Sequence, residues 1–139
     1  MYKKAGAIIL IAILISSNMY LYNKIKKADY DITIGIPVIS ENNDTAINFS
    51  DFNFISNKDE FNMITFYLMD AQIIDKPKVC DNTPNLVLTF NNNKDKIQYY
   101  KINIWINENS LIVKGNNDYK LIESNRSKDI IEIIKKYKK

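Results

Sequence analysis

The N-terminal part of the sequence is the strongest constraint on what this chain can form. Behind a short basic start, eleven uncharged and mostly apolar residues run from Ala5 to Ile15, and the uncharged stretch continues to Tyr22 before further lysines. As a helix, such a stretch would extend about 27 Å, close to the roughly 30 Å of hydrocarbon in a bilayer. The sequence therefore predicts a membrane-spanning helix within an N-terminal segment, residues 1–27.

A cleaved signal peptide is the alternative interpretation of the same segment. It has a basic start, an apolar stretch of ordinary length and small residues, Ser16 and Ser17, at its end. Ile15, however, stands where cleavage sites prefer a small residue, and this favours an uncleaved anchor. We expect a single-pass protein of the cell membrane whose C-terminal domain is extracytoplasmic, or a secreted protein if the segment is cleaved.

The residue types present exclude several kinds of site. The chain has no histidine, one cysteine (Cys80) and three glycines. Without histidine, neither a Ser-His-Asp nor a Cys-His catalytic arrangement can form, nor a histidine-ligated zinc or haem site. Neither a GxGxxG nor a GxxxxGK[ST] run occurs, and this argues against a nucleotide ligand. We predict no cofactor and no bound metal.

The charge of the C-terminal part argues against nucleic acid as a partner. From residue 28 onward the sequence has 14 basic and 16 acidic residues, although the whole chain carries +3. Four of those basic residues are lysines at the very end, so the body of this part is acidic. A nucleic-acid-binding domain needs a basic surface.

Residues 28–139 show the patterns of one α+β domain. Alternating apolar residues predict strands, which we place at Asp31–Ser40, around Ile47 and Phe49, and at Leu86–Phe90, Gln98–Asn107, Leu111–Lys114 and Tyr119–Ile122. Pro37 has no N–H to donate, so we expect the first strand to pair on one side only at that point.

Two segments change to a helical period. Asn57 can cap a helix, with Glu60 completing a capping box and an apolar stripe following from Phe61 to Ala71. A second helix is predicted to begin near residues 125–127 and to end in the basic tail. The expected architecture is an antiparallel sheet of about five or six strands, a meander in its second half, with two helices on one face.

The layout of these elements is similar to that of a known group of proteins. The segments that carry the similarity are ISNKDEFNMITFYLMDA, DNTPNLVLTF and IIEIIKKY, and its local motif is Asp81-Asn82-Thr83-Pro84 at the entry to a strand. Over about residues 28–137 the chain resembles the small exported domains of unknown function found in AT-rich Gram-positive bacteria. The resemblance implies an extracytoplasmic location and no established activity, so it assigns no functional residue.

An aromatic row on the predicted strand Gln98–Asn107 is the candidate binding site. By strand alternation, one face of this strand carries Tyr99, Lys101, Asn103 and Trp105. A face buried in the core would not hold the two polar residues, and an exposed row with an aromatic residue at each end suits a protein or glycan contact. The alternative is that another element covers Trp105.

Carboxylates are the other candidates for chemistry. They are Asp70, Asp75, Asp81, Asp95, Glu108 and Asp118, most of them in predicted turns. A glycoside hydrolase would need two of them about 5 to 10 Å apart. Asn91, Asn93 and Asp95 have the alternating spacing of a calcium loop but lack its glycine and distal glutamate, so a turn is predicted there. Cys80 has no histidine to activate it and is interpreted as a structural thiol.

These observations predict a non-catalytic, membrane-tethered extracytoplasmic binding or accessory domain with a protein partner in the envelope. It would serve as a subunit of an envelope complex or as an immunity- or inhibitor-type protein. A carboxylate-dependent hydrolase of the cell envelope is the first alternative. A pilin-like subunit is the second, although Ile11 stands where a pilin would require glutamate.

Overall fold

The computed structural model describes residues 13–21, 27–39 and 44–139. Residues 13–21 are helical, and apolar side chains such as Ile13, Ile15 and Met19 are exposed on this helix. Within the described ranges, no helix combines the length and the apolar character that crossing a membrane requires. Half of the predicted span, Ala5–Tyr22, lies outside these ranges, and the span stays a prediction.

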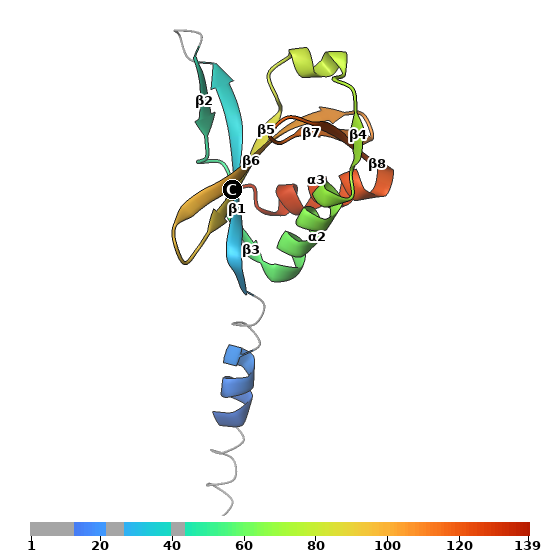
Figure 1. Cartoon of the computed structure of the whole chain (residues 1–139). Coiled ribbons are helices and arrows are strands. Elements are labelled where there is room, and N and C mark those ends of the chain that lie inside the picture. Colours follow the sequence, from blue (N-terminus) through green and yellow to red (C-terminus); the bar gives the residue numbers. More distant parts are fainter. Residues whose placement is uncertain (1–12, 22–26, 40–43) are drawn as a thin grey trace, which may run out of the picture.

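One antiparallel sheet of eight strands forms the body of the described structure (Figure 1). The strands are β1 (Lys27–Ile39), β2 (Thr45–Asn48), β3 (Ile55–Asn57), β4 (Gln72–Ile74), β5 (Leu86–Asn92), β6 (Ile97–Asn107), β7 (Ser110–Lys114) and β8 (Tyr119–Glu123). Their order is β2-β1-β5-β6-β7-β8-β4, and β3 pairs with β1. The α+β class and the antiparallel sheet are confirmed. The expected strand count was too low, because β3 and β4 have only three residues each, too few for an alternating pattern to mark them.

Strand β1 changes partners along its length. Tyr30–Gly35 pair with β5, whereas Ile36–Ile39 pair, among the described residues, with β2 alone. Pro37 therefore lies where one side of the strand is open, as predicted from its missing N–H. In Figure 1 this outer part of β1 and β2 stands apart from the remaining strands.

Two helices cover one face of the sheet, α2 (Lys58–Met69) and α3 (Ser124–Lys136). The Asn57 side chain caps α2, because its Oδ1 accepts the backbone N–H groups of Asp59 and Glu60 at 2.9 and 3.2 Å. The reciprocal half of the predicted capping box does not form. The Glu60 carboxylate instead accepts hydrogen bonds from Lys136 Nζ and Tyr137 Oη, both at 2.6 Å, and so ties α2 to the end of α3.

The two faces of the sheet have separate clusters of buried side chains. The larger cluster fills the space between the sheet and both helices and includes Ile34, Leu88, Ile104 and Ile130. On the opposite face a smaller cluster joins Trp105 and Ile112 to Cys80 of the short 3₁₀ helix η1 (Lys78–Asp81). The smaller cluster matters for the site, because it decides which residues of β6 remain accessible.

Candidate functional site

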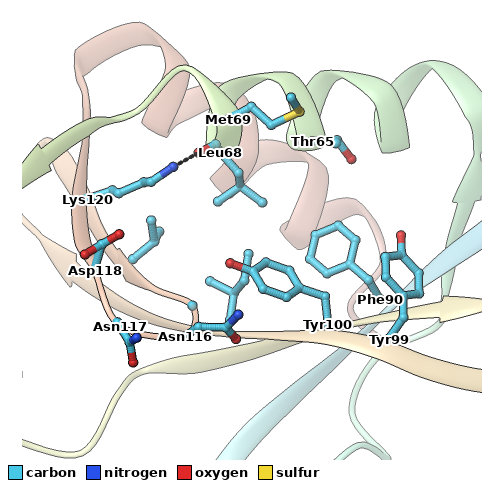
Figure 2. Close-up of a pocket in the computed structure, with 13 residues that line it drawn as sticks. Thr65, Leu68, Met69, Phe90, Tyr99, Tyr100, Asn116, Asn117, Asp118 and Lys120 are labelled. Carbon is cyan, nitrogen blue, oxygen red and sulfur yellow. Dashed lines mark hydrogen bonds between the residues drawn. The ribbon is translucent and has the colours of Figure 1, made fainter.

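An apolar hollow among the described residues lies between α2 and the sheet (Figure 2). It has a volume of about 420 Å³, within the range of ligand sites, and we call it the crevice. Its lining residues are Thr65, Leu68, Met69, Phe90, Tyr99, Tyr100, Ile102, Val113, Gly115, Asn116, Asn117, Asp118 and Lys120. Apolar and aromatic side chains form its floor and roof, and the turn 115–118 supplies the polar groups at one end.

The crevice exists because two neighbouring strands differ in length. Strand β6 has eleven residues and β7 only five, and β7 pairs with the Asn103–Asn107 part of β6. The chain leaves the sheet after Lys114 in a turn, so the first part of β6 extends beyond β7. The last turn of α2 forms the roof, where the Met69 side chain is 76% exposed.

A β-bulge brings two tyrosines to this end of β6. Phe90 pairs with Tyr100 and Asn91 pairs with Gln98, so Tyr99 is an extra residue with no partner on β5. Both tyrosine rings therefore lie near Phe90, with centroids 6.3 and 6.1 Å away. Tyr99 also makes an edge contact with Tyr30, and burial raises the pKa of the Tyr99 hydroxyl.

Gly115 makes room for Tyr100. A Cβ at position 115 would collide with the Tyr100 hydroxyl. Its φ is not positive, so glycine is needed here for close approach and not for backbone conformation. The Tyr100 ring consequently reaches across the open side of β6 toward the turn 115–118, as Figure 2 shows.

One lysine lines the crevice, and two more lie nearby on β6 and β7. Lys120 Nζ donates to the Leu68 carbonyl at 3.3 Å, which places a cation at the C-terminal end of α2 where the helix dipole favours it. Lys101 is exposed on β6, and Lys114 lies with its Nζ 4.9 Å from the centre of the Tyr119 ring. Asp118 is the one carboxylate among the described residues that line the crevice.

The predicted exposed row on β6 is not a single surface. Trp105 is 5% exposed, packs with Cys80 and Ile112, and donates from Nε1 to the Asn82 carbonyl at 2.8 Å. Of the two interpretations of Trp105, the exposed one is wrong and the covered one is confirmed, because the α2–β5 connection folds η1 over this end of the strand. Lys101 is exposed and Asn103 half-buried, as their polarity suggested.

Tyr99 is separated from Trp105 by the bulge. Simple alternation places both side chains on one face, but the extra residue shifts Tyr99 toward Phe90 and the helix side. Of the four predicted residues, the structure therefore brings Tyr99 to the crevice and Trp105 to the smaller cluster. Lys101 and Asn103 lie between them on β6.

Three of the six candidate carboxylates have cationic or amide partners. Asp70 pairs with Arg126, and Asp81 pairs with Lys76. Asp95 accepts from Asn92 Nδ2 at 3.0 Å. Within the described part of the chain, no group of three or more His, Cys, Asp or Glu residues could hold a metal ion.

The segment that resembled a calcium loop is a hairpin turn, as predicted. Asn92 Oδ1 accepts the backbone N–H groups of Lys94 and Asp95 at 2.8 and 3.3 Å. The Asn91 amide points elsewhere, donating to Asp31 Oδ1 and Thr33 Oγ1 of β1 at 2.8 and 2.7 Å. The side chains of this segment therefore hold the turn and the sheet together.

The interpretation of Cys80 as a structural thiol agrees with its surroundings. The side chain is buried beside Trp105, and this burial raises the pKa of the thiol. A raised pKa leaves less of the reactive thiolate at neutral pH.

Comparison with known proteins gives this chain no relative: no family model, no curated protein and no solved structure matches it. The resemblance to small exported domains therefore stays a prediction.

Sequence reasoning did not identify Met69, Gly115 or Lys120 as site residues. The available signal was the unequal length of the two alternating segments that became β6 and β7, since a long strand beside a short one leaves part of its edge uncovered.

Proposed function

We propose that this chain is a non-catalytic binding or accessory domain of the cell envelope, tethered to the membrane by residues 1–27. It recognises a protein partner at the crevice and acts as a subunit of an envelope complex or as an immunity- or inhibitor-type protein. The C-terminal part is extracytoplasmic. The membrane is the second partner, contacted only by the N-terminal segment.

The observation that carries the proposal is the combination of an apolar crevice with exposed apolar side chains at its mouth. Met69 is 76% exposed and Tyr99 52% exposed, beside a hollow of about 420 Å³. Large apolar groups at the rim of a concave surface gain free energy when a partner removes them from water. Methionine and tyrosine are also among the residues enriched where proteins bind one another.

The tether is supported by sequence and by exposure. The uncharged stretch Ala5–Tyr22 is long enough to cross the hydrocarbon core as a helix. In the described helical part, residues 13–21, the side chains of Leu14 and Leu21 are more than half exposed. Apolar side chains exposed along a helix are expected where lipid is its surroundings.

Fractionation and protease accessibility test the tether and its direction. The full chain should sediment with membranes, and external protease should digest residues 28–139 on intact protoplasts. Protection until lysis would place this part inside the cell and refute the extracytoplasmic assignment. A mature chain beginning near Asn18 would show that the segment is a cleaved signal.

Site-specific photo-crosslinking in intact cells tests the crevice. A photoreactive amino acid at Met69 should give a discrete protein adduct, because this side chain lies at the mouth of the crevice. The same amino acid at Glu132, exposed on α3, is the matched control and should give none. Equal adducts at both positions, or none at Met69, would contradict binding at the crevice.

A further inference from the structure

One part of β6 has an open edge beside the crevice. From Ile97 to Ile104 β6 pairs with β5, but on its other side β7 covers only Asn103–Asn107. In the described structure no strand pairs with residues 97–101 on that second side. An uncovered edge presents backbone N–H and C=O groups that can pair with an added strand.

The register shows which residue faces this opening. Asn107 and Ser110 close a two-residue hairpin and so form a hydrogen-bonded pair, and the pairs at Trp105–Ile112 and Asn103–Lys114 follow the same alternation. Lys101 lies two residues before Asn103 on β6, so its backbone N–H and C=O groups also point toward the β7 side. Because the chain turns away from the sheet after Lys114, no residue of β7 lies opposite Lys101, and these groups face the open edge.

Hollows of different character lie on the two sides of this edge. Toward α2 lies the crevice, with Leu68 and Met69. Toward the other face lies a shallower groove of about 370 Å³, whose lining includes Gln98, Lys101 and Asn103. Both hollows also touch Tyr99, Tyr100, Gly115 and Asn116. Successive side chains of a strand point to opposite faces, so an added strand would place alternate side chains in the apolar crevice and in the polar groove.

Charge indicates what the groove accepts. Lys101 lines it, and Lys114, directly opposite Asn103, lies on the same face of the sheet. Neither lysine makes an ion pair within the described residues. A carboxylate beside them would gain attraction, whereas a second copy of this edge would place lysine near lysine.

We propose that the partner binds as an extended peptide segment that adds a strand, antiparallel, to the open edge of β6 at Lys101. This inference rests on the proposed function and specifies its partner chemistry: apolar side chains enter the crevice, and the acidic side chains between them face Lys101 and Lys114. Backbone pairing supplies the register, and the two hollows supply the specificity.

Calorimetry on the full chain in a mild detergent tests this directly. The probe is a blocked peptide of sequence Glu-Leu-Glu-Val-Glu, compared with the same peptide carrying lysine in place of each glutamate. In an antiparallel pair, the peptide residue opposite Lys101 places its side chain on the same face of the sheet as Lys101, so this residue is a glutamate. Because the backbone groups of Lys101 face the open edge, the N–H groups of the glutamates point toward β6 and those of Leu and Val point away. N-methylation of the glutamates should weaken binding at least about tenfold, whereas N-methylation of Leu and Val should not.

The outcomes separate the proposals. Strand addition is refuted if neither the glutamate peptide nor the lysine peptide binds. It is also refuted if both N-methylated forms bind as tightly as the unmethylated peptide. A lysine peptide that binds as tightly as the glutamate peptide refutes the charge argument. Lys101→Glu should reverse the preference between the two peptides, and Lys128→Glu, exposed on α3, is the matched control.

Lys101→Pro provides the test in cells. It removes the edge N–H without removing a bond to β5, and unchanged circular dichroism should show that the fold is retained. The crosslink from Met69 should then be lost. A crosslink that persists in this variant overturns strand addition and leaves the crevice as a binding site, whereas a crosslink absent from the parent chain refutes the proposed function itself.

Discussion

The two halves of β6 have similar sequences and different surroundings. Both alternate apolar and polar residues, and each carries an aromatic residue at an odd position, Tyr99 in the first half and Trp105 in the second. Trp105 is covered by η1 and pairs with Ile112 of β7, whereas Tyr99 is half-exposed beside an open edge. Residue type therefore does not decide which aromatic side chain is available for binding. The lengths of the neighbouring elements decide it.

The largest expected effect tests the covered half. Trp105→Ala should lower the free energy of unfolding by about 3–5 kcal/mol, because it empties a buried site and leaves the Asn82 carbonyl without its donor. Denaturant unfolding measures this, with Trp105→Phe as a less destabilising control that keeps most of the apolar volume. A change near 0.5 kcal/mol, usual for a surface residue, would mean that Trp105 is exposed and that the two halves do not differ.

A second substitution tests the helix side of the same half. Ile104 is 1% exposed within the larger cluster, next to Trp105 in sequence but on the opposite face of the sheet. Ile104→Ala should cost about 2–5 kcal/mol in the same unfolding measurement. If only one of these two substitutions is strongly destabilising, just one face of the covered half is a true core.

A pH titration tests the hydrogen bond that fixes α2, the helix that forms the roof of the crevice beside the open half of β6. Tyr137 donates to Glu60 and so fixes α2 against α3; burial and this carboxylate raise the pKa of Tyr137 to about 12. The unfolded chain releases the tyrosine proton near pH 10, so the stabilisation is complete below that pH and is lost as the pH rises toward about 12. Tyr137→Phe should remove this part of the pH dependence. An unchanged profile in the variant would assign the alkaline loss of stability to other groups.

Much of the fold could be predicted from sequence, because the relevant signals are local. The alternation of β6, the Asn57 cap and the one-sided pairing at Pro37 each follow from neighbouring residues. The site could be predicted only in part, because it depends on distant elements. The bulge at Tyr99 appears only when β5 and β6 are aligned, and the burial of Trp105 requires η1, more than twenty residues earlier. The crevice also needs the end of α2 above a place where β7 has stopped.

The smallest expected effect on stability completes the comparison. Tyr99→Ala should change the free energy of unfolding by only about 0.5–1 kcal/mol, because the side chain is half-exposed and loses mainly its ring contacts with Tyr30 and Phe90. The same substitution should nevertheless weaken partner binding, since aromatic truncation at the centre of an interface often costs about 2 kcal/mol or more in affinity. Unfolding and peptide calorimetry on one preparation measure both quantities. A loss of stability as large as that of Trp105→Ala would place Tyr99 in the core, and the open half of β6 would then be as structural as the covered half.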